Sequence, residues 1–542
     1  MTSLSLGRLG GLGLLASCAD GSEDALAGTD GVSQSDSDPN LPAVKNGISV
    51  VVIGSGYGSA VTAARLTEAG IPVTMLEAGR LWAPGPDGTT FCKPFSPDGR
   101  AMWFKDQTET NMKSFLGFPV EMKVPVEAGI MEARGPESMR AFQGKGVGGG
   151  SLINMAIYLQ PDRAKLRSTL PMVNANEFYN RHLRRALGRL GAGSASQRLI
   201  NSEAYRYTRV GMAFAEKAGF RSSPLQSGYD FKYMEQELDN KVPKSALGGE
   251  AGFGNNYGKR SLDKTYLADA LGTGLLTVHA LHVVKRITVN PSGGYVVEAD
   301  QIDLLGKVLE TKQFPCTHLF LGAGSMATSE LLVRARERGD LPNLNKEVGT
   351  KWGPNGDLFI ALDNPLGQPT GALQSTIPSH YFVARDGKNR RVVSQYAPIP
   401  MGLPLWQSLI IMIADNPEAG YFKYDSTTDS ANLVWDRSQN TPSTDAAKFI
   451  FDQVNAKART SYSQVIKFLG DAQFGDTVTY HPVGGVPLGA ATDEYGRIRE
   501  YPGLYVNDGS LIPIGIGANP SLSITALAER NIERLLATDF AA

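Results

Sequence analysis

The chain has 542 residues, of which 42% are hydrophobic and 20% charged, so it is long enough to bury a large core and to form more than one domain. Its 53 basic and 54 acidic side chains leave a net charge of −1, which excludes a global field that attracts nucleic acid or an anionic membrane. The three cysteines have neither metal-ligand spacing nor the pattern of a disulfide framework. We expect a globular protein without a metal site.

Residues 1–45 differ in composition from the rest and predict an export leader followed by a flexible tether. One basic residue, Arg8, precedes a short apolar stretch that ends at Leu15-Ala16-Ser17-Cys18, as in a bacterial lipoprotein signal. Residues 19–40 are rich in Ser, Asp and Gly, as in a tether. We expect an exported protein with a lipid anchor through Cys18; the alternative is an unstructured leader on a cytoplasmic protein. No apolar span is long enough for a transmembrane helix.

The segment that follows the leader predicts a buried strand, a tight turn and a helix, in the run Val51-Val52-Ile53-Gly54-Ser55-Gly56-Tyr57-Gly58-Ser59-Ala60. Gly54 permits the turn, and Gly56 lets the backbone approach a pyrophosphate at the positive N-terminus of the helix. The third fingerprint position is Ser59, a small residue that helix–strand packing tolerates, with Gly58 adding room. A second strand ends at Glu77, about 20 residues later, where a carboxylate binds a ribose 2′-OH. The pattern predicts a dinucleotide site for an unphosphorylated adenosine ribose.

The middle of the chain predicts a loop-rich region and a second glycine-rich turn. Residues 81–140 are rich in Pro and Gly without clear periodicity, and so long an irregular segment is usually functional. The cluster Gly144-Lys145-Gly146-Val147-Gly148-Gly149-Gly150-Ser151 follows, and its glycines indicate backbone pressed against a ligand.

Later segments predict mainly strands. Residues 276–289 alternate as one strand, and glycines at 293–294 join it to a second strand in a hairpin. His279 and His282 would then point to opposite faces and could not share a metal. Residues 357–475 hold alternating apolar segments between turn residues, which predict a mainly antiparallel second domain with helices.

Chemistry-bearing residues gather near the carboxyl end. Thr479-Tyr480-His481-Pro482 places His481 at the exit of a strand, where rigid scaffolds present reactive groups, although a hydrogen-bonded turn histidine is an alternative. A further strand ends in Asp508-Gly509. Asn519-Pro520 opens a helix whose N-terminus has unpaired N–H groups and a partial positive charge, suited to an anionic ring. Asn519 is also a candidate helix cap.

These blocks together resemble the glucose–methanol–choline (GMC) oxidoreductases, and within them the cholesterol oxidase subgroup. The resemblance covers about residue 47 to the C-terminus. It rests on the glycine fingerprint, the block from Gly146 to Asn154, the segment around His481 and Asn519, and further blocks at 254–259, 321–325 and 353–356.

The resemblance implies an α/β fold with two discontinuous domains. One is a Rossmann-like FAD-binding domain, expected at 46–86, 133–160, 259–348 and 472–542. The other is a substrate domain with a mainly antiparallel sheet and helices, expected at 87–132, 161–258 and 349–471. No His or Cys stands where other members attach the flavin covalently, so the resemblance implies non-covalent FAD. Its expected contacts are Gly54, Gly56, Tyr57, Gly58, Ser59, Glu77, Gly146, Val147, Gly150, Ser151, Asn154, Val283, Gly322, Asp508, Gly509 and Pro520.

The resemblance also implies the chemistry. His481 would accept the proton of a substrate hydroxyl while hydride moves to flavin N5, and Asn519 would position that hydroxyl. An imidazole with an ordinary pKa near 6.5 is a suitable base at neutral pH. Dioxygen would then reoxidise the flavin and leave as hydrogen peroxide. The implied substrate is a sterol or a similarly bulky apolar secondary alcohol.

One position departs from the subgroup. Pro404 stands where the cholesterol oxidase pattern has the glutamate that moves the ring double bond, and proline has no proton-accepting side chain. Nearby Gln395 and Gln407 offer hydrogen bonds, but neither is a base. We therefore expect oxidation with little or no isomerisation. Two other functions stay open, an alcohol dehydrogenase with an acceptor other than oxygen, and a lyase or isomerase in which FAD is structural.

Overall fold

The computed structural model describes residues 25–26, 45, 47–83, 85, 87–364, 367, 369–399 and 405–542. The expectations for Cys18, for most of the leader and for Pro404 therefore lie outside the described residues. Within the described residues, no helix combines the length and the apolar character needed to cross a membrane.

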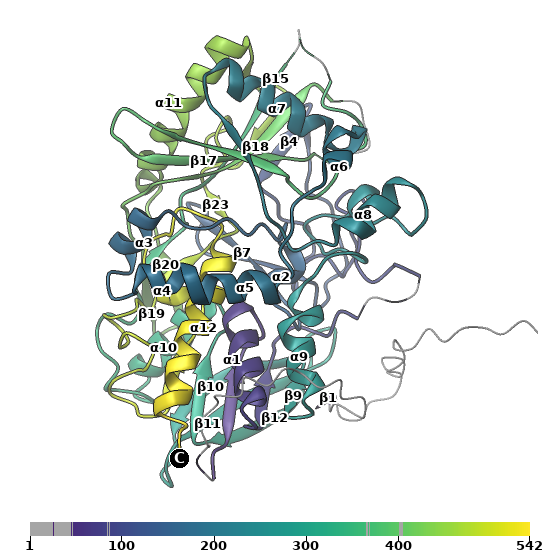
Figure 1. Ribbon diagram of the computed structural model, residues 1–542. Helices are drawn as coiled ribbons and strands as arrows, with labels where there is room; N and C mark the ends of the chain where they lie inside the picture. Colours follow the sequence, from purple (N-terminus) through teal and green to yellow (C-terminus); the bar gives the residue numbers. More distant parts are fainter. Residues whose placement is uncertain are drawn as a thin grey trace, which may run out of the picture.

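A parallel sheet forms the lower half of the molecule in Figure 1. Its strand order is β9 (Leu276–His279), β3 (Val73–Leu76), β2 (Val50–Ile53), β13 (His318–Leu321) and β25 (Leu504–Val506), and β1 (Ala25–Leu26) adds an antiparallel edge to β9. All four residues of β2 are buried, as expected for a β-branched run in a parallel sheet.

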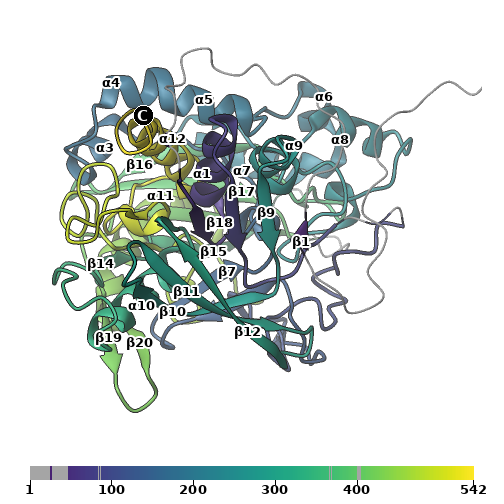
Figure 2. The ribbon, with the colours of Figure 1, turned by 90° about the horizontal axis from the view of Figure 1, so that it is seen from below.

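Both faces of this sheet are covered. Helices α1 (Tyr57–Glu68), α9 (Tyr266–Gly272) and α12 (Pro520–Thr538) lie on one side, and the antiparallel strands β10 (His282–Val289), β11 (Tyr295–Ile302) and β12 (Val308–Cys316) lie on the other (Figure 2). Helix α10 (Ser325–Glu337) packs on β10. The predicted α/β fold is confirmed.

The register brings the strand ends together. Ile53 pairs with Leu76 on one side and with Leu321 on the other, and Leu321 pairs with Val506. The residues that follow these four strands therefore share one edge of the sheet, where open α/β sheets bind their ligands.

A six-stranded antiparallel sheet forms the upper half of the molecule (Figure 1). Its order is β21 (Ser461–Tyr462), β15 (Asp357–Asp363), β18 (Gln407–Ala414), β17 (Arg391–Ala397), β16 (His380–Arg385) and β8 (Ser222–Pro224). Leu358, Ile360 and Leu362 pack with helices α7 (Arg206–Lys217) and α11 (Thr441–Ala458) in one core. Because side chains alternate along a strand, Asp357 and Phe359 face the other way, toward the parallel sheet.

The prediction of one continuous strand over residues 276–289 is wrong in one respect. It breaks at Ala280-Leu281, where Leu281 has φ +56°, so that β9 joins the parallel sheet and β10 joins the antiparallel meander. Leu281 N donates a hydrogen bond to Gly79 O, and His282 N donates one to Glu77 O. These two bonds fix the backbone at the break. The hairpin between β10 and β11 is confirmed. The break also brings the rings of His279 and His282 within 5.1 Å of each other, which corrects the expectation of opposite faces.

Candidate active site

A cavity of about 650 Å³ lies where the strand ends of the parallel sheet face the upper sheet. Its wall includes the residues after β2, β3 and β13, the glycine turn after β7 (Arg140–Gly144), and side chains of β15, β17 and β18. A cavity of this size and position is the default binding site of such a fold.

Two glycine turns meet at the cavity floor. Gly56 precedes α1, and Gly149 precedes the short helix α2 (Gly150–Ile153). A Cβ placed on Gly149 would lie 2.9 Å from Gly56 Cα, whereas a Cβ on Gly56 or Gly150 would meet no atom within 4 Å. Bare backbone therefore faces open space at the N-terminus of α1, which fits the pyrophosphate of FAD.

Two other fingerprint glycines serve packing. A Cβ on Gly54, which has φ +89°, would lie 2.5 Å from Gly322 O, and one on Gly58 would lie 1.6 Å from Asn507 O. These glycines let α1 and its turn pack closely on the neighbouring strand ends. Gly54, Gly58 and Gly322 also line the cavity.

Glu77 follows β3 and lines the same cavity. Its carboxylate accepts hydrogen bonds from Ser55 Oγ at 2.6 Å and from Gly79 N at 2.9 Å. Burial raises the pKa of Glu77, and these hydrogen bonds oppose the rise. The carboxylate is fixed at the position expected for a ribose partner.

Four expected cofactor contacts do not line the cavity. Ser59 donates to Gly322 O, and the N–H of Gly146 donates to Glu77 Oε1. Val147 is buried in the core, and Ser151 Oγ donates to Gly148 O within the glycine turn. These residues help to build the turns, and their contacts with the cofactor stay predictions. Small residues in a glycine-rich turn serve either purpose, and the pattern alone does not separate the two.

Asp508 also serves the frame of the site. Its carboxylate accepts hydrogen bonds from Gly324 N, Thr328 Oγ1 and Ser510 N, so it ties the start of α10 to the end of β25. Burial raises its pKa against the effect of these donors. Asp508 lines the cavity together with the other expected contacts, which are Tyr57, Asn154, Val283, Gly509 and Pro520.

The side chains of Asn154 and Tyr57 are hydrogen bonded to each other. Asn154 Nδ2 donates to the Tyr57 hydroxyl at 2.8 Å, and Asn154 Oδ1 accepts from Ala156 N at 3.0 Å. The ammonium of buried Lys259 donates to the carbonyl oxygens of Leu152, at 2.9 Å, and of Asn154. Burial, with nearby Lys264, lowers the pKa of Lys259 to about 7. The side-chain nitrogen of Lys259 therefore anchors this loop from inside the protein.

His481 follows β23 (Val478–Thr479), which pairs with β7, and its ring lines the cavity. Its Nδ1 lies 2.6 Å from Oδ1 of Asp357, whose side chain is 1% exposed. The second oxygen of Asp357 accepts from Thr479 Oγ1 at 2.9 Å and from Tyr480 N at 3.0 Å. Because an ionised carboxylate only accepts, Nδ1 donates to Asp357, and in the neutral imidazole Nε2 then presents a lone pair.

Asn519 lies beside that lone pair. Its Nδ2 is 3.3 Å from His481 Nε2, and its Oδ1 accepts from Gln395 Nε2 at 2.8 Å. It precedes α12, but its side chain makes no capping hydrogen bond, so the candidate cap is not formed. The structure thus brings both predicted catalytic residues together, 38 positions apart in sequence.

Sequence reasoning missed Asp357. The residue comes directly after the block Gly353-Pro354-Asn355-Gly356 and opens a buried strand. An acidic residue in that setting needs a partner, and this was the available signal. The partner, His481, lies 124 positions away and could not be named from spacing.

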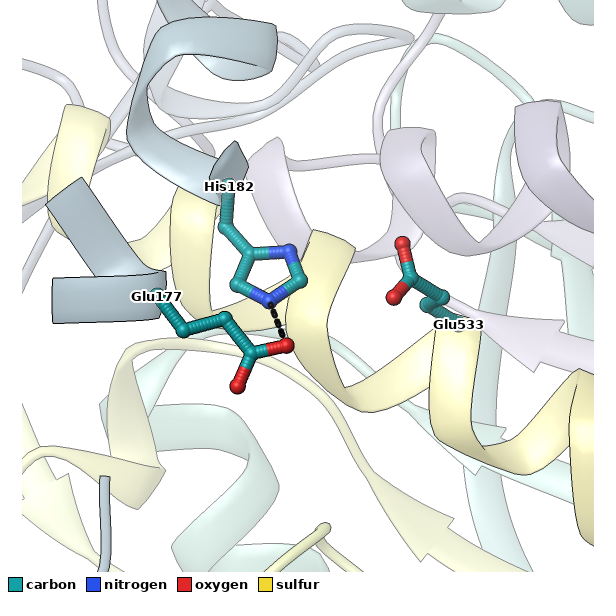
Figure 3. Close-up of side chains that lie close together, drawn as sticks. All are labelled: Glu177, His182 and Glu533. Carbon is teal, nitrogen blue, oxygen red and sulfur yellow. Dashed lines mark ion pairs between the residues drawn. The ribbon is translucent and has the colours of Figure 1, made fainter. Parts of the chain in front are cut away.

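A second group of titratable residues lies outside the cavity, at Glu177, His182 and Glu533 (Figure 3). His182 Nε2 is 3.7 Å from Glu177 Oε1. Arg181 and Arg185 pair with the two oxygens of Glu533 at 2.9 and 3.0 Å. Burial and these guanidinium groups lower the pKa of His182 to about 3. Because Arg181 and Arg185 already pair with the carboxylate of Glu533, we interpret this group as an ion-pair network.

Family models match most of the chain. The GMC oxidoreductase models match residues 121–336 and 421–528, and the model GMC oxidoreductase, C-terminal matches residues 355–467. A cholesterol oxidase of Mycobacterium tuberculosis is 26% identical, with 89% of this chain and 90% of the relative covered. A cholesterol oxidase of Acinetobacter baumannii is 24% identical, with 89% and 93% covered.

Solved structures share the fold. Pyridoxine 4-oxidase from Mesorbium loti has a TM-score of 0.57 at 14% identity, with 90% of this chain and 99% of that chain covered. An FAD-dependent oxidoreductase from Chaetomium thermophilum has a TM-score of 0.61 at 12% identity, with 91% and 100% covered. The chain therefore belongs to the GMC oxidoreductase family and is an FAD-dependent oxidoreductase that acts on alcohols.

Proposed function

We propose that this protein oxidises a sterol or a similarly bulky apolar secondary alcohol, uses dioxygen as the electron acceptor, and does little or no double-bond isomerisation. The observation that carries the proposal is the position of His481, which lines a cavity beside the glycine turns and is hydrogen bonded through Nδ1 to Asp357. The names of the two curated relatives support a sterol.

The cavity wall away from the glycine turns favours a bulky apolar substrate. Its apolar side chains come from both halves of the molecule and include Met112, Met122, Phe142, Phe253, Phe359, Ile399, Leu409 and Ile411. Such a wall excludes water from the reacting carbon and binds substrate through apolar contact.

The residues at the reacting end divide the work. FAD, when bound without a covalent link, would accept the hydride and would then pass the two electrons to dioxygen. Gly56 and Glu77 would hold its pyrophosphate and ribose, and the N-terminus of α12 at Pro520 would face its ring. His481 Nε2 accepts the hydroxyl proton of the alcohol, and Asn519 Nδ2 donates a hydrogen bond that orients the same oxygen.

The carboxylates of the cavity support oxidation without isomerisation. Among the described residues the cavity is lined by Glu77, Glu109, Glu132, Glu330, Asp357 and Asp508. Each accepts hydrogen bonds or forms an ion pair, for instance Glu109 with Arg140 at 2.5 Å and Glu132 with Lys145 at 2.9 Å. Neither Pro404 nor residues 400–403 contain a basic side chain that could move a proton. The absence of a basic side chain at positions 400–404 of the sequence supports oxidation without isomerisation.

Product analysis tests the proposal. The holoenzyme is incubated in air with a 3β-hydroxy-5-ene steroid, and peroxide and ketone are measured together. We expect equal amounts of both, with the ketone unconjugated. Ketone formed only with an artificial acceptor, without peroxide, would indicate the dehydrogenase. Rapid formation of the conjugated ketone would contradict the proposed absence of isomerisation.

We also propose export with a lipid anchor at Cys18, supported by the leader pattern alone. The mass of the mature N-terminus tests it. A chain that begins at a diacylated Cys18 is expected, and an intact Met1 would contradict it.

A further inference from the structure

Gln395 lies at the reacting end of the cavity although it belongs to the upper sheet. It is on β17, its side chain is 0% exposed, and it lines the cavity. Its Nε2 donates to Asn519 Oδ1 at 2.8 Å, while its Oε1 is buried without a hydrogen-bond partner. A buried acceptor left unpaired is unfavourable, so packing alone gives no reason for an amide here.

The hydrogen bonds around Asn519 run in one direction. Asp357 accepts from His481 Nδ1, which in the neutral imidazole leaves Nε2 as an acceptor. Asn519 must then present its nitrogen to Nε2, and its oxygen must turn away. Gln395 supplies the donor that this oxygen needs. The opposite orientation of Asn519 would place its oxygen against the Nε2 lone pair, with two acceptors in contact.

We propose that Gln395 is a positioning residue that keeps the amide nitrogen of Asn519 turned toward His481 and the oxygen of the substrate. The inference rests on the proposed alcohol oxidation. Asp357 and Gln395 lie on β15 and β17, and they hold the two ends of the chain Asp357–His481–Asn519–Gln395. The upper sheet thereby orients both reacting groups of the lower half.

A double-mutant cycle tests this role. The variants are Gln395→Met, Asn519→Ala and the pair, and the measurement is the rate of anaerobic flavin reduction by any alcohol that reduces the wild-type flavin. We expect a loss of roughly 30-fold for Gln395→Met, with no further loss when it is added to Asn519→Ala. The proposal would be overturned if the losses of the two single variants multiplied in the double variant, or if Gln395→Met kept the wild-type rate.

The matched control is Ser394→Ala. Ser394 is the preceding residue on β17, its buried hydroxyl also lacks a hydrogen-bond partner, and strand alternation points it to the opposite face. We expect wild-type flavin reduction in this variant. The melting temperature and the FAD affinity of all variants should stay near the wild-type values.

A spectroscopic test is independent of activity. The variant Gln395→Glu, measured at a pH at which the introduced carboxyl group is ionised, replaces the donor by an acceptor, so Asn519 should turn its nitrogen to that carboxylate and its oxygen to His481. In protein with ¹⁵N-labelled histidine, the His481 Nε2 resonance should move toward the range of a protonated nitrogen in Gln395→Glu and stay unchanged in Ser394→Ala. If no alcohol reduces the wild-type flavin, the proposed function fails, and this resonance still decides the role of Gln395. An identical resonance in all three proteins would overturn it.

Discussion

The two walls of the cavity are built in different ways. The lower wall presents backbone at two glycine turns, together with side chains such as Glu77 and Asp508. The upper wall consists of side chains on alternate positions of β15, β17 and β18, among them Asp357 and Gln395. Backbone recognition requires glycines at fixed spacing and leaves a motif, whereas side chains on a sheet need only face the right way. In the proposed function, the lower wall would bind the cofactor and the upper wall would orient the reacting groups.

The largest expected effect concerns the residue at which the two walls meet. His481→Ala removes the proton acceptor, so flavin reduction by alcohol should fall about 1,000-fold while FAD stays bound. The measurement is stopped-flow absorbance without oxygen. The control is His380→Ala, a partly buried histidine on β16 beside Ser379. An unchanged rate in His481→Ala would remove this residue from the mechanism.

Asp357→Asn tests whether Asp357, in the upper wall, orients the ring of His481. An amide can donate to Nδ1 and so favour the wrong ring tautomer, and we expect flavin reduction to fall about 100-fold. Asp363→Asn, on the same strand but hydrogen bonded to Gln407 and Gln464, should keep the wild-type rate. Equal losses in both variants would point to general damage of β15.

Gly56→Ala tests the backbone wall alone. Its Cβ meets no atom of the protein, so the apoprotein should keep its melting temperature while FAD affinity falls about tenfold. Gly58→Ala puts a Cβ 1.6 Å from Asn507 O and should instead destabilise the apoprotein. Fluorescence titration with FAD and thermal unfolding separate the two outcomes. Unchanged affinity in Gly56→Ala would place the pyrophosphate elsewhere.

The smallest effect concerns Lys259, beneath the lower wall. Its pKa of about 7 lies below the ordinary value near 10.5, so between these pH values the unfolded chain binds more protons than the folded one. Stability should therefore rise with pH across this window. We expect Lys259→Met to remove roughly 2 kcal/mol of that rise, measured by denaturant unfolding at pH 7 and pH 10. Exposed Lys241→Met should leave the rise intact.

Sequence predicted the two walls unequally. The run from Gly54 to Ser59 and the position of Glu77 predicted a strand, a turn and a second strand that the structure contains. The break at Leu281 was not predicted, because the alternating pattern continues through it and carbonyl groups of Glu77 and Gly79 set its direction. Strand periodicity says which residues share a face, but not which sheet a strand joins.

The link between Asp357 and His481 was beyond sequence for a related reason. The two residues are joined by tertiary packing of β15 against the turn after β23, and no local pattern encodes that contact. Ser59, Gly146, Val147 and Ser151 show a second limit. They belong to the motif, and each is hydrogen bonded or buried within the turns. The motif alone does not say which of its residues also contact a ligand.

The most direct test is anaerobic bleaching of the flavin in the wild-type holoenzyme by sterols, terpenoid alcohols and long-chain alcohols. The proposed function predicts that a 3β-hydroxysteroid bleaches the flavin fastest and that readmitted air restores the yellow colour with release of peroxide. Flavin that stays oxidised with every alcohol would contradict it and would favour a lyase or isomerase in which FAD is structural.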